Sequence, residues 1–362
     1  MPAEKLDLIV TVLRPGRFGT ALLVPLAENV QQAIVYLADP EANRIFQETQ
    51  EIQKYFPGYK LPSNVHSTNN LEEALQKSNV VLITTPTKHF RTVAESALPL
   101  MQEDQILVSG SKGLEEGTNM RMSQVIRDIN PRFKKKCRAV ISGPNFAREI
   151  IRGLPTATVI ASENDALTRR LQRLFRTSRF LPYRSGDVIG VELGGALKNP
   201  IALAVGICHG MGLGDNATAA LKNRGFREMT RLAVVLGADE RTLMGLAGEG
   251  DLSLSSRPGG RNYDAGVAIG QGEDPELLLQ SDQTIEALYT IRPAIALARK
   301  KNVRVPILEG IYGIIYGGLE PAQVLDMLVE RYHGYEGPQP IIDRRIGLLL
   351  RLLNRLLHRW GG

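Results

Sequence analysis

Lys198 is the residue with the clearest potential for chemistry, because it lies in a segment of apolar and small residues from Val191 to Gly210 that has helical spacing. Desolvation disfavours the charged form of a lysine, so Lys198 needs a polar partner, and Asp251 is the natural one. A desolvated lysine oriented by a carboxylate can act as general acid toward a carbonyl oxygen. A buried ion pair without a catalytic role is the structural alternative.

Two further groups of polar residues could hold a substrate beside that lysine. Asn199 follows Lys198 directly in the same apolar segment, where its amide also needs a partner. Arg261 and Asn262 follow two glycines, and an arginine beside an asparagine has the donor geometry for a phosphate group. The residue types therefore indicate a carbonyl compound that carries a phosphate.

Lys112 belongs to a second set of candidates, in two loops that each follow an apolar strand-like run. One loop reads SGSKG at residues 109–113 and the other reads SGPNFA at residues 142–147. In an open parallel sheet both loops lie at the carboxyl edge, where ligands bind. Lys112 is therefore placed to contact a ligand, although a single lysine after a strand is more often a surface residue.

A glycine-rich turn at residues 14–19, with the sequence RPGRFG, follows the first apolar run. In a dinucleotide-binding fold such a turn leads into a helix whose N–H groups face the pyrophosphate. Gly16 and Gly19 match the second and third glycines of that fingerprint, whereas Arg14 replaces the first and Pro15 has no N–H to donate. The position of the turn favours a nucleotide site over an ordinary strand-to-helix connection.

The scaffold predicted to position these residues begins with an α/β region. Short runs rich in Val and Ile alternate with amphipathic segments up to residue 185, which predicts a Rossmann-like domain with a mostly parallel, doubly wound sheet. A helix over residues 70–77 is expected, entered by the capping residues 67–70. The predicted strands are Leu8 to Leu13, Ala33 to Leu37, Val80 to Thr84, Ile106 to Ser109, Ala139 to Ser142 and Thr158 to Ala161.

From Gly186 onward strand signals fade, and Ala, Leu and Gly dominate. Helical spacing runs through residues 191–210, 217–237 and 284–302, which predicts an all-α second domain. We expect three parts: a dinucleotide-binding domain at residues 1–185, a helical substrate and catalytic domain at residues 186–335, and a tail helix at residues 336–362.

Composition excludes several other classes of protein. The chain has 362 residues, 43% of them hydrophobic, with 35 glycines, 20 prolines and no collagen-like period, so we expect a packed core. The chain has two cysteines, Cys137 and Cys208, and five scattered histidines, which provide neither a disulfide framework nor zinc-ligand spacing. We therefore expect no metal, and we expect a reducing compartment. The first apolar run, broken by Arg14 and Pro15, is too short for a secretory signal or a membrane span. A net charge of +6 is mild, and the basic clusters at residues 134–138 and 169–179 are interpreted as solvated faces rather than a nucleic-acid site.

Four longer stretches together resemble the NAD(P)-dependent glycerol-3-phosphate dehydrogenases of the soluble bacterial type. The similarity runs from the first strand to about residue 331. The stretches are SGSKGLEEGT, SGPNFAREIIRGLPTA, GVELGGALKNPIALAVGICHGMGLGDNATAAL and MGLAGEGDL, at residues 109–118, 142–157, 190–221 and 244–252.

The resemblance implies a role for each candidate residue. Lys198 would be the proton donor and acceptor, with Lys112 and Asp251 completing the catalytic set. The implied substrate-binding residues are Lys112, Gly143, Asn145, Lys198, Asn199, Asp251, Arg261 and Asn262. The implied cofactor-binding residues are Gly16, Arg17, Phe18, Gly19, Lys112, Ala147, Arg261 and Glu286.

The implied reaction is reversible hydride transfer between NAD(P)H and dihydroxyacetone phosphate, giving sn-glycerol 3-phosphate for phospholipid synthesis in the cytoplasm. A homodimer is a further expectation. The chain departs from the family pattern at Arg14-Pro15-Gly16, where the family has G-A-G, and at Ala38-Asp39, where an arginine often precedes the acidic residue, so the choice between NAD and NADP stays open. Ser253 to Pro258 replaces a segment that contains Thr and Cys, and Gly260 replaces a frequent Ser.

Two alternative functions remain. The first is a related dehydrogenase with a Rossmann and a helical domain that acts on another small ketone or hydroxy acid, although Arg261 and Asn262 argue against a substrate without phosphate. The second is a non-catalytic nucleotide-binding or membrane-docking protein, which the altered glycine turn and the tail would suit.

The tail, residues 336–362, lies outside the resemblance and carries five arginines against Glu336 and Asp343. It predicts a basic amphipathic helix. Packing on the same or a neighbouring subunit is the preferred interpretation, and peripheral contact with an anionic membrane is the alternative. One face would carry Ile342, Ile346, Leu349, Leu350, Leu353, Leu356, Leu357 and Trp360, and the other Arg344, Arg351, Arg355 and His358.

Overall fold

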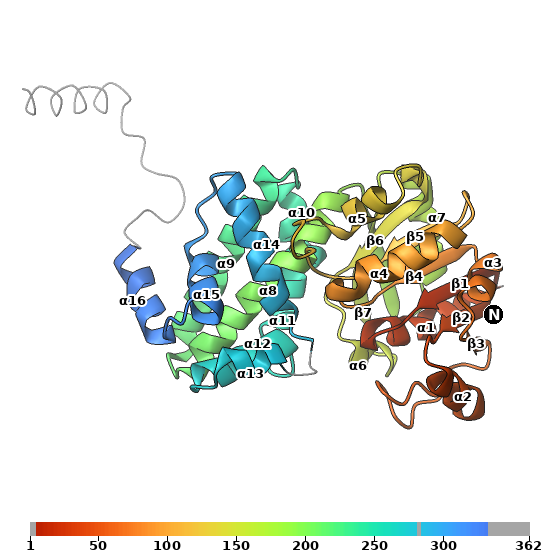
Figure 1. Cartoon of the computed structure of the whole chain (residues 1–362), viewed down its shortest axis with the longest axis horizontal. Coiled ribbons are helices and arrows are strands. Elements are labelled where there is room, and N and C mark those ends of the chain that lie inside the picture. The colour runs from red at the N-terminus through yellow and green to blue at the C-terminus, as the bar shows by residue number, and fades with distance from the viewer. Residues whose placement is uncertain (1–4, 281–283, 332–362) are drawn as a thin grey trace, which may run out of the picture. The chain divides into compact units, whose positions relative to one another are not determined.

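The computed structural model describes residues 5–280 and 284–331 (Figure 1). The chain divides into two compact units, one that ends at Pro321 and one that begins at Ala322. The predicted tail helix lies outside the described residues, and the predicted division at residues 185 and 335 stays a prediction.

Eight strands of the described residues form one sheet in the order β3-β2-β1-β4-β5-β6-β7-β8. Neighbouring strands are parallel except β6 and β7, which are antiparallel. The predicted α/β class with a mostly parallel sheet is confirmed. The strands are β1 (Leu6–Leu13), β2 (Val30–Tyr36), β3 (Val65–Thr68), β4 (Val80–Ile83), β5 (Ile106–Ser109), β6 (Arg138–Ser142), β7 (Thr156–Ala161) and β8 (Phe180–Ser185).

Helices cover both faces of this sheet, which explains why its central strands are apolar throughout. In β4, Val80 and Leu82 join a cluster with α1 and α7, whereas Val81 and Ile83 join a cluster with α4 and α5. The helices of this region are α1 (Arg17–Asn29), α2 (Pro40–Thr49), α3 (Leu71–Gln76), α4 (Thr87–Ala97), η1 (Leu98–Leu100), α5 (Met122–Ile129), η2 (Lys135–Cys137), α6 (Ala147–Ile150) and α7 (Asp165–Phe175).

All six predicted strands are present, with ends that differ by up to three residues, but the edge strands β3 and β8 were not predicted. β3 reads VHST and has one apolar residue. β8 contains Pro182, which an edge strand tolerates because the backbone N–H groups on its outer side bond to no neighbouring strand. The assignment of Ser67 and Thr68 to a helix entry was wrong, since both belong to β3. Asn70 does cap α3, accepting a hydrogen bond from the backbone N–H of Glu73.

After residue 185, the regular elements of the described residues are all helices, as predicted. The three expected helices correspond to α8, α9 and α14, whereas the short helices between residues 240 and 280 were not predicted. The elements are α8 (Val188–Gly210), α9 (Gly214–Val235), α10 (Glu240–Met244), the π-helix η3 (Leu246–Gly250), α11 (Asp251–Ser255), α12 (Arg261–Gly270), α13 (Pro275–Gln280), α14 (Glu286–Lys300), α15 (Pro306–Tyr316) and α16 (Pro321–Arg331).

Helix α8 is the core of the helical region, and α12 packs against it through glycines. A Cβ on Gly206 would lie 2.1 Å from the carbonyl oxygen of Tyr263, and one on Gly266 would lie 2.1 Å from that of Leu203. Only glycine permits this approach of two helix backbones. By length and composition α8 could cross a membrane, but 89% of its apolar window is buried inside the protein, so its apolar character is that of a core helix.

Candidate active site

The carboxyl edge of the sheet meets the helical region at Lys112, in the loop after β5. The Lys112 ammonium donates to the carbonyl oxygen of Gly143 at 2.8 Å and to Oδ2 of Asp251 at 2.6 Å. Gly143 belongs to the loop after β6, and Asp251 begins α11. One lysine therefore links both predicted loops to the helical half of the chain.

Lys198 occupies the other side of the same carboxylate. Its Nζ donates to Oδ1 of Asp251 at 2.7 Å and to Oγ of Ser255 at 2.5 Å. Asp251 is 2% exposed and Lys198 is 6% exposed, so the pair is shielded from water. The pairing expected from the sequence is present, and a single carboxylate joins the two lysines.

Ser255 is a site residue that the sequence analysis did not single out. It is buried and lies four residues after Asp251, so both side chains project from the same face of α11. A helix predicted to start at Asp251 would have placed Ser255 on the same face as Asp251, and this was the signal that could have identified Ser255. The start of α11 could not be recognised in the sequence, because the irregular π-helix η3 precedes it and no apolar repeat marks where α11 begins.

Two glycines of α8 bring its backbone close enough for Lys198 to reach this position. A Cβ on Gly194 would lie 2.5 Å from the carbonyl oxygen of Ala247 in η3, and one on Gly195 would lie 2.6 Å from Oγ of Ser142 at the end of β6. Lys198 follows within one helical turn. The glycines of this apolar segment therefore allow the side chain of Lys198 to reach Asp251.

Burial lowers the pKa of Lys198 to about 8. Asp251 opposes that shift, whereas the positive charges of Lys112 and Arg261 add to it. A group with a pKa near the working pH is well suited to give and take a proton. The site therefore has the electrostatic character of a general acid and base.

Asn199 and Asn262, both predicted to contact substrate, hydrogen-bond to each other. Nδ2 of Asn262 donates to Oδ1 of Asn199 at 3.0 Å, and Oδ1 of Asn262 accepts from the backbone N–H of Ala287 at 2.9 Å. Asn199 also donates to the carbonyl oxygen of Gly195 at 3.4 Å. These amides tie α8, α12 and the start of α14 together beneath the site.

Arg261 begins α12 and donates to the carbonyl oxygen of Thr284 at 2.9 Å. Desolvation lowers its pKa, and nearby Glu286 opposes the shift while Arg17 adds to it. Arg261 as a whole residue is nevertheless exposed to solvent, which leaves guanidinium donors available for an anion. The influence of Arg17 on Arg261 brings the glycine-rich turn and the predicted phosphate site into one neighbourhood.

The glycine-rich turn begins α1 as predicted. Gly16 is the N-cap residue and provides no side chain for the first N–H groups of α1, which leaves them and the helix dipole to an anionic ligand. Arg14 stands where the fingerprint has its first glycine, and it adopts the left-handed conformation with φ of 42°. Phe18 lies against Lys112, with the ammonium 6.0 Å from the ring centre. A Cβ on Gly19 would lie 2.1 Å from Oγ1 of Thr84.

Unpaired hydroxyl groups line the same edge of the sheet. The side-chain oxygens of Thr84, Thr85 and Ser109 are buried and have no hydrogen-bond partner within the described part of the chain. They follow or end β4 and β5, next to the open N-terminus of α1. A dinucleotide with its polar ribose and phosphate groups fits this combination.

The remaining predicted residues lie around the same edge. Glu286 accepts a hydrogen bond from Oγ1 of Thr87 at 3.2 Å, and burial raises its pKa. Asn145 donates to the carbonyl oxygen of Ala157 and accepts from Thr158, both at 2.9 Å, so its amide shapes the loop after β6. Ala147 is the first residue of α6 and packs on the core that contains α1.

A metal site is not evident in residues 5–280 and 284–331, where no three His, Cys, Asp or Glu side chains cluster. Cys137 and Cys208 are both buried free thiols.

Sequence comparisons agree with this geometry. Residues 9–168 match the family described as NAD-dependent glycerol-3-phosphate dehydrogenase N-terminus, and residues 187–326 match its C-terminus. Two relatives named glycerol-3-phosphate dehydrogenase [NAD(P)+] are similar over most of their length. The one from Carboxydothermus hydrogenoformans is 39% identical over 89% of this chain and 96% of its own, and the one from Pelotomaculum thermopropionicum is 41% identical over 90% and 94%.

Solved structures give the same assignment. The crystal structure of glycerol-3-phosphate dehydrogenase from Coxiella burnetii has 34% sequence identity and a TM-score of 0.84, and covers 90% of this chain and 99% of its own. A Plasmodium falciparum glycerol-3-phosphate dehydrogenase, at 20% identity and a TM-score of 0.80 over 92% of this chain and 97% of its own, shares the fold. The chain belongs to the NAD-dependent glycerol-3-phosphate dehydrogenase family.

Proposed function

We propose that this protein is an NAD(P)-dependent glycerol-3-phosphate dehydrogenase in which Lys198 exchanges the proton with the oxygen on C2 of the substrate. The observation that carries the proposal is the buried contact of Lys198 with Asp251 and Ser255, in the electrostatic field of Lys112 and Arg261. The nicotinamide cofactor supplies or accepts the hydride when it is bound.

Lys198 acts on the charge that develops at the ketone. Negative charge grows on the carbonyl oxygen as the ketone is reduced, and an ammonium already in position stabilises that charge before it gives up its proton. Asp251 holds Lys198 and Lys112 by separate carboxylate oxygens, so both amines are oriented before substrate arrives. The arrangement limits reorganisation during the reaction.

Arg261 and Asn262 hold the phosphate of dihydroxyacetone phosphate in this proposal. A dianion bound at the start of α12 fixes the other end of a three-carbon substrate near Lys198, and binding energy is thereby converted into orientation. Gly143, Asn145 and Asn199 surround the substrate. The donors of Asn199 and Asn262 that now bond within the protein would be shared with the ligand.

The cofactor is held along the carboxyl edge of the sheet. Its pyrophosphate would meet the free N–H groups of α1 at Gly16, Arg17, Phe18 and Gly19. Lys112, Ala147, Arg261 and Glu286 would line the remainder of the binding site. Arg14 and Pro15 offer less backbone freedom than the usual glycine turn. The choice between NADH and NADPH rests on contacts outside residues 14–19.

We infer that the physiological direction is reduction, which provides sn-glycerol 3-phosphate for phospholipid synthesis in the cytoplasm. This part of the proposal rests on the likeness to the bacterial enzymes. A homodimer is the expected assembly, and size-exclusion chromatography with light scattering tests it.

Initial rates of NADH and NADPH oxidation with dihydroxyacetone phosphate test the proposed reaction. Turnover that disappears in Lys198→Ala, while the variant still binds the nucleotide, supports it. Turnover only with another ketone would favour a related dehydrogenase, and nucleotide binding without turnover on any ketone would favour a non-catalytic protein. Comparing the two nucleotides also settles cofactor preference.

A further inference from the structure

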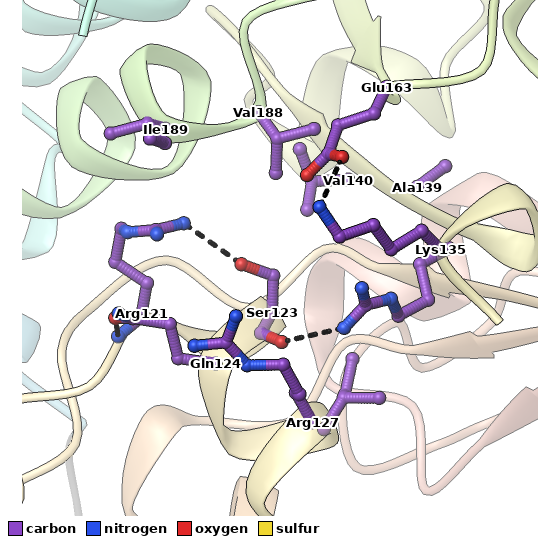
Figure 2. Close-up of a pocket in the computed structure, with 12 residues that line it drawn as sticks. Arg121, Ser123, Gln124, Arg127, Lys135, Ala139, Val140, Glu163, Val188 and Ile189 are labelled. Carbon is purple, nitrogen blue, oxygen red and sulfur yellow. Dashed lines mark hydrogen bonds and ion pairs between the residues drawn. The ribbon is translucent and has the colours of Figure 1, made fainter. Parts of the chain in front are cut away.

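A hollow of about 200 Å³ lies between α5, the start of β6 and the start of α8 (Figure 2). None of the residues assigned above to substrate or cofactor lines it. Figure 2 shows side chains from separate elements, including Arg121, Arg127, Lys135 and Val188, gathered around this space. The hollow is thus distinct from the proposed active site.

The charged residues that line the hollow are predominantly cationic. Arg121, Arg127, Lys135 and Arg138 face one lining carboxylate, that of Glu163. Glu163 is paired with Lys135 at 2.9 Å. Arg121 is paired outside the lining, with Glu192 of α8. The other two arginines form no ion pair with the residues that the structure describes.

Arg138 and Arg127 are these two arginines. The Arg138 guanidinium donates one weak hydrogen bond, to the carbonyl oxygen of Ser123 at 3.3 Å. The side chain of Arg127 makes no hydrogen bond or ion pair with the residues that the structure describes. Desolvation lowers the pKa of Arg138; the carboxylates of Glu163 and Glu192 oppose that shift, and the positive charge of Arg127 adds to it. Two guanidinium groups with free donors and mutual repulsion form a site that an anion would stabilise.

The opposite part of the lining is apolar and small. Ala139, Val140, Val188 and Ile189 contribute it. The volume is below the roughly 300–1,000 Å³ of pockets for drug-sized ligands. A ligand that fills the hollow is therefore short, with an anionic head for the arginines and a few carbon atoms for the apolar wall.

We propose that this hollow is a second anion site, which binds a small phosphate monoester through Arg127 and Arg138. The site itself does not depend on the reaction proposed above, whereas the stoichiometry expected below includes the proposed substrate site at Arg261. The ligand would join α5, which follows the loop of Lys112, to α8, which carries Lys198, and so would stabilise the folded arrangement of both.

Isothermal titration of the full chain with glycerol 3-phosphate, at low ionic strength and without nucleotide, tests the proposal. Arg127→Gln with Arg138→Gln removes the hollow's free donors, and Arg261→Gln removes the main donor of the proposed substrate site. Lys134→Gln with Lys136→Gln is the matched control, since it removes two positive charges from the neighbouring exposed segment without changing the lining. Melting temperatures establish that each variant is folded.

We expect two sites per chain in the unaltered protein and in the lysine control. One site should remain in the Arg127/Arg138 variant and in Arg261→Gln, and none in their combination. Equal stoichiometry and affinity in the Arg127/Arg138 variant and the control would overturn the proposal. Inorganic phosphate is the second probe: it should bind the same site more than tenfold more weakly, because it does not reach the apolar wall. If Ile189→Ser leaves the affinity for glycerol 3-phosphate unchanged, a short carbon chain is not part of the recognised ligand.

Discussion

Lys198 and Asp251 are 53 residues apart in the chain, yet their charged atoms meet at 2.7 Å with little access to water. Removing one partner of such a pair leaves an uncompensated buried charge, which commonly costs about 3–5 kcal/mol. For this reason Asp251→Ala tests stability as much as catalysis. Substitutions of the lysine are more informative about the reaction, because Asp251 then still has Lys112 as its partner.

Lys198→Met should fold and bind nucleotide but lose most of its turnover. Methionine keeps much of the lysine stem and removes the proton-donating group, and general acid catalysis contributes about 10²–10⁴-fold in rate. Steady-state kcat for dihydroxyacetone phosphate reduction provides the measurement, with nucleotide affinity from fluorescence titration as the control. A kcat within twofold of the unaltered chain would remove Lys198 from the mechanism.

The rate of ketone reduction should fall as the pH rises through about 8. Burial places the pKa of Lys198 near that value, and only the protonated amine can donate. Oxidation of glycerol 3-phosphate needs the neutral amine, so its rate should rise over the same interval. Profiles of kcat in both directions give the test, and two profiles of the same slope would contradict the assignment.

Ser255→Ala should shift that pH profile rather than abolish activity. Ser255 contacts the Lys198 ammonium at 2.5 Å, so its loss leaves Asp251 as the remaining partner of the amine. We expect a kcat about tenfold lower, with a displaced apparent pKa, and Ser255→Thr should restore both. Ser256→Ala is the matched control, because the hydroxyl of Ser256 has no hydrogen-bond partner among the described residues. An unchanged profile in Ser255→Ala would count against a positioning role.

Glu228 should make folding stability depend on pH. This carboxylate of α9 accepts hydrogen bonds from the N–H groups of Ile307 and Leu308 at the start of α15, and burial raises its pKa to about 7. The folded state then holds a proton that the unfolded state releases near pH 4.5, so stability falls as the pH rises from about 5 to 7. The full effect is about 3 kcal/mol. Urea unfolding across this range checks it, and Glu228→Gln should flatten the dependence; the same slope in the variant would refute the assignment.

Gly206→Ala should destabilise the chain, although alanine is ordinarily the better helix former by about 1 kcal/mol. The added Cβ would lie 2.1 Å from the carbonyl oxygen of Tyr263, so α8 and α12 would have to separate. Overpacking of this kind costs about 1–3 kcal/mol or more. Thermal unfolding beside Gly186→Ala, where a Cβ meets nothing within 4 Å, distinguishes packing from backbone effects. Equal melting temperatures would contradict the packing argument.

Removing the tail after Gly337 should leave sedimentation with anionic phospholipid vesicles unchanged. The sequence favours packing of the tail on protein over membrane contact, and these residues lie outside the described structure. Co-sedimentation of the full and shortened chains provides the comparison. Vesicle binding that is lost with the tail would establish the membrane interpretation instead.

The sequence predicted the central strands and the long helices because their signals are local. Val80 to Ile83 is an apolar run, and α8 is recognisable from its length and composition. The edge strands were missed because few buried contacts shape their composition, as the single valine and the polar residues of β3 illustrate. The same reasoning explains the short helices near residue 250, whose positions depend on packing against α8.

The pairing of Lys198 with Asp251 was predictable because an isolated charge in an apolar helix requires a partner. The second contact of Asp251, with Lys112, was not predictable, since it depends on how the loop after β5 meets the helical region. Ser255 likewise needed the start of α11 to be known. Residue types can show that charges must be compensated, whereas the selection among candidate partners is made by tertiary structure.

Asp251 also restricts how this protein could be divided or recombined. Its two oxygens bind amines from opposite halves of the chain, so the isolated α/β half would retain Lys112 without its carboxylate partner. A chimaera assembled from two related enzymes would have to preserve all three members together. A chimaera that takes Asp251 from one parent and its two lysines from another must therefore keep the geometry of all three residues.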